Sequence, residues 1–159
     1  MDVTMKLQGF KELAEALKEL PQNISKNVLR SAVGAGAAVV RVEAKNNALA
    51  MKKTGTLARS IYQKQIRELS GPEKQTFFVG ARSGKLYRSV GKKGVNKDAY
   101  YARWVELGHF SRPAKKGAGH VHWVPAHPFL RPAFDVRKAE AVDAIGQKIA
   151  ARLQTIKAK

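Results

Sequence analysis

The sequence contains no cysteine, which excludes both a disulfide framework and a thiolate metal site. This absence fits a protein made in a reducing cytoplasm. No stretch reaches the ~18 uninterrupted apolar residues of a membrane-spanning helix. The first residues, 1–7, lack the basic and apolar regions of a secretion signal. We therefore expect no membrane partner.

Acidic residues are also scarce. The chain has 12 Asp and Glu against 30 Lys and Arg, which gives a formal net charge of +18 at pH 7. A field of this sign attracts polyanions, so nucleic acid is one expected class of partner. A subunit of a larger assembly could use the same surface to meet acidic neighbours, and the net charge alone leaves both possibilities open.

Signatures of catalysis and of cofactor binding are missing as well. The glycines of residues 84–94 follow neither the P-loop nor the dinucleotide pattern. All four histidines lie between His109 and His127, and on a strand His120 and His122 would point to one face, as a metal site can require. Their spacing matches no specific zinc signature, so we expect packing and loop hydrogen bonds instead. We predict no catalytic residue, no cofactor and no metal, with a metal-dependent hydrolase as a remote alternative.

Hydrophobic periodicity predicts helices toward both ends of the chain. A short amphipathic helix is expected from Phe10 to Leu20 and a long one from Pro21 to Leu49. Pro21 and Pro132 suit helix starts, because proline needs no N–H there. The apolar stripe of the second helix consists of Ile24, Val28, Ala32, Ala35, Val39 and Val42. The stripe of the last helix consists of Val136, Val142, Ile145, Ile149, Leu153 and Ile156.

The middle of the second helix, residues 32–38, contains only small residues and valine. Glycine in a helix costs about 1 kcal/mol relative to alanine. The glycines at 34 and 36 therefore predict a close approach of another backbone, with simple tolerance in a long helix as the alternative.

Strands are expected between the helices. Residues 62–69 and 75–81 predict a β-hairpin, residues 120–124 a further strand, and residues 3–7 a short leading strand. A chain of 159 residues is most simply one domain. The predicted fold is α+β, with long N-terminal and C-terminal helices packed on a small, mostly antiparallel sheet.

Three short motifs give the sharpest local signals. Residues 54–61 (TGTLARSI) predict a turn at Gly55 and a short helix that Thr56 caps. Residues 101–108 (YARWVELG) predict a short helix that ends at Gly108 in the left-handed conformation, although a strand is also possible. Residues 127–134 (HPFLRPAF) predict a proline-bracketed helix start. We assign structural roles to Thr54, Gly55, Leu57, Ser60, Tyr101, Glu106, Gly108, Pro128, Phe129 and Pro132.

Glu106 is the only acidic residue between Asp98 and Asp135. A general base is one interpretation of such a carboxylate. No nucleophile or second carboxylate stands at a suggestive spacing, so a structural ion pair with Arg103 or Arg131, or a helix cap, is the preferred interpretation.

Two basic segments are the best functional candidates. Residues 82–98 and 109–119 predict long loops rich in glycine and cations. Such a surface suits binding to a phosphate backbone, or ordering against a neighbouring subunit. The cations concerned are Arg82, Lys85, Arg88, Lys92, Lys93, Lys97, Arg112, Lys115 and Lys116.

Taken in order, the three motifs resemble a family of tailed-bacteriophage neck and tail-completion proteins, the minor tail protein Z-like family of long-tailed phages. The resemblance implies a non-enzymatic virion protein of the neck, made in the cytoplasm of the host bacterium. Such a protein helps to complete the tail and to join it to the DNA-filled head. The expected form is a sixfold or twelvefold homo-oligomeric ring, next to tail-terminator or head-closure proteins and around channel DNA. The alternative is a stand-alone basic nucleic-acid-binding protein, whose binding should weaken steeply with salt.

Overall fold

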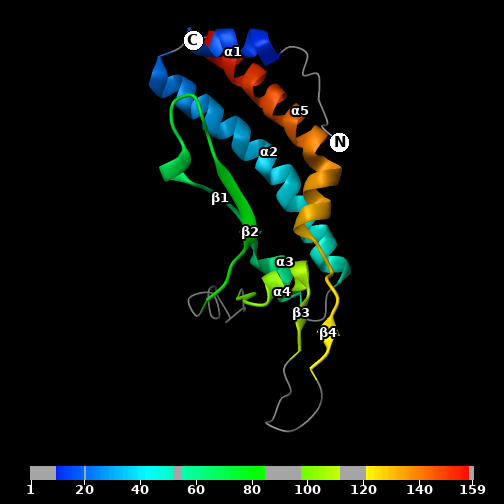
Figure 1. Ribbon diagram of the computed structural model, residues 1–159. Helices are drawn as coiled ribbons and strands as arrows, with labels where there is room; N and C mark the ends of the chain where they lie inside the picture. The colour runs from blue at the N-terminus through cyan, green and yellow to red at the C-terminus, as the bar shows by residue number, and fades with distance from the viewer. Residues whose placement is uncertain (1–9, 20, 52–54, 85–97, 112–120, 158–159) are drawn as a thin grey trace. The chain divides into compact units, whose positions relative to one another are not determined.

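The computed structural model describes residues 10–19, 21–51, 55–84, 98–111 and 121–157 (Figure 1). Within these residues it is an α+β structure with long helices toward both ends of the chain and two small two-stranded sheets, which confirms the predicted fold class. The elements are α1 (Phe10–Lys18), α2 (Gln22–Ala50), α3 (Thr56–Ser60), β1 (Ile61–Gln65), the 3-10 helix η1 (Arg67–Leu69), β2 (Phe77–Ala81), α4 (Ala102–Leu107), β3 (His109–Phe110), β4 (Trp123–Val124) and α5 (Leu130–Lys157).

The chain divides into two compact units, each with its own core. Unit 1 comprises Met1–Val39, Gln63–Phe78 and Lys138–Lys159, and unit 2 comprises Val40–Tyr62 and Val79–Arg137. The boundaries fall inside α2, β1, β2 and α5, so each of these elements contributes residues to both units. None of the helices in the described residues is long and apolar enough to cross a membrane.

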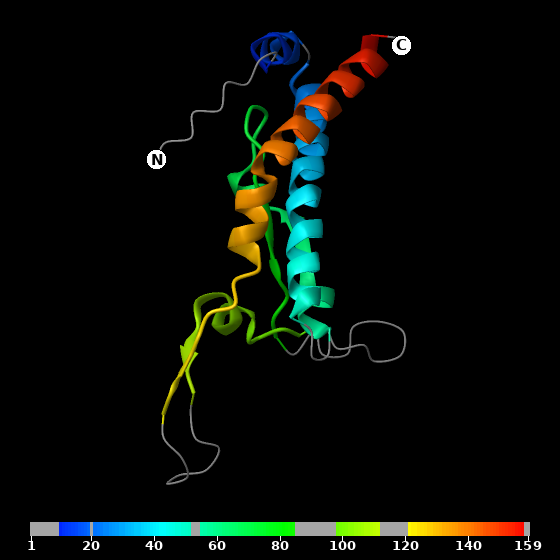
Figure 2. The same ribbon diagram turned by 90° about the vertical axis from the view of Figure 1, so that its right-hand side faces the viewer.

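The core of unit 1 joins α1 to the first half of α2 and the last part of α5. Leu17 of α1, Val28 of α2 and Leu153 of α5 are buried together, with Ala32 and Ile149. Figure 2 shows the first turns of α2 next to the C-terminal part of α5. Burial of a large apolar side chain contributes about 1.5–3 kcal/mol, so these contacts hold the three helical segments together.

The small residues of α2 allow a close helix contact within unit 1. A Cβ atom on Gly36 would lie 2.7 Å from Cγ1 of Ile145 and 2.8 Å from the backbone oxygen of Ala141, both in α5. A Cβ atom on Gly34 would meet only the ring of Phe77, at 3.3 Å. The predicted close approach of another backbone is therefore confirmed at Gly36.

This difference predicts opposite outcomes for two equivalent substitutions. Gly36→Ala should lower the free energy of unfolding by about 1–3 kcal/mol, because the added methyl group overpacks the contact with α5. Gly34→Ala should leave it unchanged or raise it by up to about 1 kcal/mol, since the Phe77 ring can shift and alanine favours a helix. Urea unfolding followed by circular dichroism measures both values. Equal destabilisation by the two variants would contradict the predicted contact.

The core of unit 2 is built largely from alanine around one fully buried phenylalanine. Phe129 is 0% exposed. It lies in a cluster with Ala44, Ala48, Leu57, Ala58, Ile61, Ala99 and Ala133. Strands β3 and β4 pair antiparallel, with His109 opposite Val124 and Phe110 opposite Trp123.

The hairpin is confirmed, but its strands are shorter than predicted. The structure pairs β1 with β2. The first strand was expected to reach residue 69; it ends at Gln65, and residues 67–69 form η1 instead. Beyond β1 the Ile66 N–H still donates to the Thr76 carbonyl at 2.9 Å. The Ser70 hydroxyl donates to the Ile66 carbonyl at 2.6 Å and accepts from the Thr76 N–H at 3.0 Å, so the bonds next to η1 are local.

The predicted apolar stripes are wrong at Val42 and Val136, which are 50% and 69% exposed. In α2 the buried positions follow a strict four-residue row, 28, 32, 36, 40, 44 and 48, which includes glycine and alanine. The predicted stripe leaves this row at Ala35, because it follows the average helical repeat of 3.6 residues, whereas the buried row repeats every four. In α5, likewise, Ala133 and Ala141 are buried whereas Val136 is not.

Other boundaries also differ from the predictions. Helix α5 begins at Leu130, two residues before Pro132, and the strand expected at 120–124 consists of residues 123–124 only. The second basic loop was expected to begin at residue 109, but residues 109–110 form β3. The strand predicted at residues 3–7 lies outside the described residues.

Candidate interaction site

The first motif positions α3 in the core of unit 2. Gly55 precedes the helix with φ 71° and ψ 4°, a left-handed conformation that suits glycine. Thr56 was expected to cap this helix; it is instead the first helical residue, and Gly55 occupies the N-cap position. Leu57 is buried, and the buried Ser60 hydroxyl donates to the Leu57 carbonyl at 2.6 Å. Thr54 lies outside the described residues.

Glu106, in the second motif, caps helix α5. Its carboxylate accepts backbone N–H bonds from Phe129 at 2.8 Å, Leu130 at 3.0 Å and Arg131 at 3.0 Å. The first four N–H groups of a helix have no partner inside it. Three of them donate to Glu106, and the fourth position is Pro132, which has no N–H.

The cap, one of the two structural roles expected for Glu106, is the one that the structure shows. These three bonds go to backbone N–H groups and not to an arginine side chain. At Arg131 the donor is the backbone N–H. A carboxylate near a helix N-terminus also interacts favourably with the helix dipole.

Gly108 ends α4 in a conformation other than the predicted one. Its φ of 73° is positive, but its ψ of 167° is extended, a combination that only glycine adopts readily. A Cβ atom here would lie 2.6 Å from Cζ2 of Trp123 and 2.9 Å from the Val124 carbonyl oxygen. Gly108 therefore lets β4 pass close to the end of α4.

The third motif inserts the Phe129 side chain into the core of unit 2, and backbone bonds hold the motif in place. The Asn47 side-chain amide donates to the Phe129 carbonyl at 3.2 Å, and the His127 N–H donates to the Val105 carbonyl at 2.8 Å. Pro128, between them, is exposed. Tyr101 packs against the same core. The described residues of the three motifs thus meet in unit 2, where their contacts are structural.

Few of the predicted basic residues are described. Arg82 lies with its guanidinium carbon 4.8 Å from the centroid of the Tyr62 ring, a cation–π contact. The buried Asp98 accepts the Gly84 N–H at 2.9 Å, and the Ala99 N–H donates to the Arg82 carbonyl at 2.9 Å. These bonds fix both ends of the first basic segment. The remaining predicted cations, Lys85, Arg88, Lys92, Lys93, Lys97, Arg112, Lys115 and Lys116, lie outside the described residues.

The histidines that the structure describes have separate surroundings. The ring of His109 stacks on Trp104, with centroids 5.6 Å apart, and Nδ1 of His122 lies 2.8 Å from the Ser111 hydroxyl. His127 uses its backbone N–H, as described above. His120 lies outside the described residues. Within the described ranges, no three histidine or carboxylate side chains are placed to share a metal ion.

Unit 2 carries two groups of rings, which we together call the aromatic surface: Tyr100 and Trp104 with the half-buried His109, and Phe110 with Trp123. Tyr100 meets Trp104 edge-on at 5.8 Å, and Phe110 meets Trp123 at 5.0 Å between centroids. Trp104 is 47% exposed and Phe110 67% exposed. Contiguous exposed apolar side chains mark interaction sites, and tyrosine, tryptophan and phenylalanine are enriched in protein–protein interfaces.

A family model described as "Bacteriophage HK97-gp10, putative tail-component" matches residues 11–108. The chain belongs to this HK97-gp10-like family. No curated protein and no solved structure matches the chain. The resemblance to tailed-phage neck and tail-completion proteins is thereby confirmed at the level of a phage tail component, a structural protein of the virion.

The HK97-gp10-like match covers the first two motifs and ends at Gly108. The third motif lies beyond it, yet its backbone supplies the three N–H groups that bind Glu106. The aromatic surface was missed by sequence reasoning. The signal that could have found it was the density of aromatic residues in 100–110 and at 123, all in segments too short to bury them.

Proposed function

We propose that this HK97-gp10-like tail component is a ring-forming subunit of the phage neck, which completes the tail and helps to join it to the DNA-filled head. In this role it is a building block and not an enzyme. Its neighbours along the tail axis are a tail-terminator or head-closure protein, and the ring is sixfold or twelvefold. The basic segments at 85–97 and 112–119 meet acidic neighbours or the DNA in the channel.

The observation that carries this proposal is the aromatic surface of unit 2. A monomer with no partner gains nothing from exposing Trp104 and Phe110, whereas a subunit buries such side chains on assembly. Around a ring, each subunit contacts the next through two different patches. The aromatic surface is one of the two patches in this proposal.

Light scattering tests the ring. The purified chain should have the mass of a closed ring, and a variant with both Trp104→Ser and Phe110→Ser should be a monomer. Loss of a central interface aromatic costs about 2 kcal/mol or more, so two losses should dissociate the ring at micromolar concentration. Phe78→Ser, which removes an exposed aromatic from unit 1, is the matched control and should leave the mass unchanged.

Head joining tests the function itself. Tails made without this chain should fail to join purified heads, and addition of the purified chain should restore joining. The double aromatic variant should not restore it. Joining that proceeds normally without the chain would contradict a role in tail completion.

The net charge of +18 supports a second candidate, a stand-alone nucleic-acid-binding protein. Light scattering with added duplex DNA, at low and moderate salt, separates the two. A monomer that binds DNA tightly at moderate salt, with affinity falling linearly against salt on logarithmic axes, favours this second function.

A further inference from the structure

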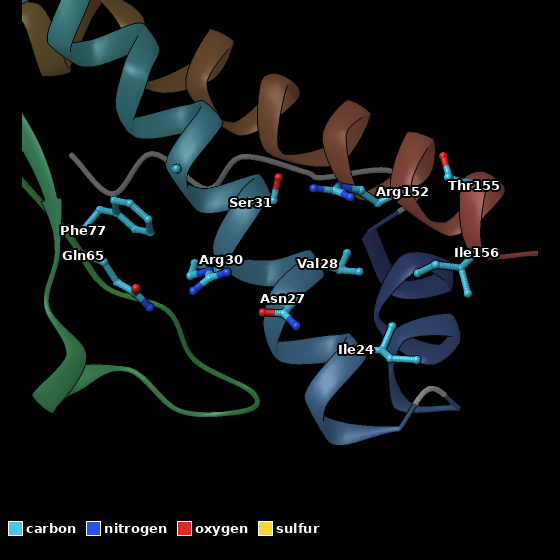
Figure 3. Close-up of a pocket in the computed structure, with 11 residues that line it drawn as sticks. Ile24, Asn27, Val28, Arg30, Ser31, Gln65, Phe77, Arg152, Thr155 and Ile156 are labelled. Carbon is cyan, nitrogen blue, oxygen red and sulfur yellow. The ribbon is translucent and has the colours of Figure 1, made fainter.

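Unit 1 contains a pocket of about 760 Å3 that none of the three motifs forms (Figure 3). It lies among the first half of α2, the last turns of α5 and the β1–β2 hairpin, and all its lining residues belong to unit 1. This volume falls in the range of ~300–1,000 Å3 that is typical of ligand-binding sites.

Part of the pocket lining offers hydrogen-bond donors. Arg30 and Asn27 of α2 and Arg152 of α5 line it, and Figure 3 shows their side chains turned toward the space between the elements. Among the described residues, neither guanidinium has a hydrogen-bond or ion-pair partner. None of the described residues in the lining is acidic. The pocket therefore presents two uncompensated positive charges, and guanidinium groups bind carboxylates through paired hydrogen bonds.

The rest of the lining is partly apolar. Val28 is buried, and the half-buried Phe77 and Ile156 line opposite ends of the pocket, with Arg30 between them in Figure 3. Apolar side chains at both ends of a pocket that holds two arginines suit a ligand that has both carboxylates and apolar side chains. Duplex DNA presents phosphates on a broad convex surface and would leave these apolar residues without a contact.

We propose that this pocket binds an acidic segment of another protein. Carboxylates of the segment pair with Arg30 and Arg152, and apolar side chains of the segment pack on Phe77 at one end of the pocket and on Ile156 at the other. A second copy of this chain is a poor occupant, because it carries the same net charge of +18. The terminal residues of this chain, 1–9 and 158–159, are also poor occupants, because they contain one acidic residue, Asp2.

Fluorescence anisotropy tests the proposal with a labelled synthetic peptide of alternating glutamate and leucine. The full chain should bind this peptide at moderate salt. A double variant with Arg30→Gln and Arg152→Gln should bind about tenfold or more weakly, the loss expected for two charge-assisted contacts. Both arginines are exposed, so circular dichroism should report an unchanged fold.

The matched control removes the same two charges from the same two helices. Lys26 and Lys148 are exposed, stand four residues before Arg30 and Arg152 respectively, and do not line the pocket. The Lys26→Gln, Lys148→Gln variant should weaken peptide binding clearly less than the arginine variant does, because neither lysine lines the pocket and salt partly screens exposed charges. Equal weakening by the two double variants would overturn the pocket as the site.

Changes to the probe complete the test. Peptides with glutamine in place of glutamate, or serine in place of leucine, should both bind more weakly, and the original peptide should shift the methyl resonances of Ile156. No peptide binding, or equal binding of all three peptides, would overturn the proposal. So would competition by duplex DNA that depends on Arg30 and Arg152, which would make the pocket a nucleic-acid contact.

This inference does not depend on ring formation. The double aromatic variant of unit 2 should bind the peptide normally, and the double arginine variant should keep the mass of the unchanged chain. Failure of one proposal therefore leaves the other intact.

Discussion

Replacement of Glu106 with alanine is expected to lower the free energy of unfolding by about 3 kcal/mol, because it removes three charge-assisted bonds at once. The carboxylate accepts the N–H groups of Phe129, Leu130 and Arg131, and these bonds attach α4 to the start of α5. Without it, three backbone donors beside the fully buried Phe129 lose their partner. Urea unfolding followed by circular dichroism measures the change.

Two further variants separate the cap from its charge. Glu68→Ala removes the same charge from an exposed position in η1, and such surface changes usually stay within about 0.5 kcal/mol. Glu106→Gln keeps one acceptor oxygen and should lose less stability than the alanine variant. If Glu68→Ala and Glu106→Ala destabilise equally, the net charge and not the cap is responsible.

Gly108→Ala is expected to destabilise the protein by a similar amount, about 3 kcal/mol. A non-glycine residue in this backbone conformation costs about 1–3 kcal/mol. The new Cβ would also lie 2.9 Å from the Val124 carbonyl oxygen, and overpacking of this kind costs about 1–3 kcal/mol more. For a chain of this size we expect a fall in Tm of about 6–12 °C, which differential scanning calorimetry measures.

The control for Gly108 is another glycine with neither constraint. A Cβ atom on Gly71 meets nothing within 4 Å, and its φ is not positive. Gly71→Ala should therefore change Tm little. A normal Tm for Gly108→Ala would mean that α4 and β4 separate more easily than their contact indicates.

The helices of this protein were largely predictable from sequence, and their buried faces only in part. The extents of α1 and α2 follow from periodicity and from Pro21, a local signal. The buried row of α2 depends on which helix lies against it, so Gly36 is buried while Val42 is exposed. The small residues at 32–38 indicated that a close contact exists, but the residue pattern of one helix does not show which face makes it.

The candidate sites also contain features that could be predicted from local sequence and features that could not. The motifs were recognised as folding devices because turn glycines and helix-start prolines have fixed local meanings. The partners of Glu106 could not be predicted, since they stand more than 20 residues further along the chain. The aromatic surface and the unit 1 pocket arise only when separate segments come together. Arg82 was expected in a basic loop that meets DNA or a neighbouring subunit, and its guanidinium lies over the Tyr62 ring.

The cap on α5 also limits how this protein can hold a polyanion. A free helix N-terminus is a ready binding site for phosphate, because its N–H groups and dipole both favour negative charge. At α5 the Glu106 carboxylate already fills that position. DNA therefore cannot be held by the N-terminus of α5, and lysine and arginine side chains are its expected contacts. The slope of the logarithm of the DNA affinity against the logarithm of the salt concentration should then be proportional to the number of those side chains that contact phosphates.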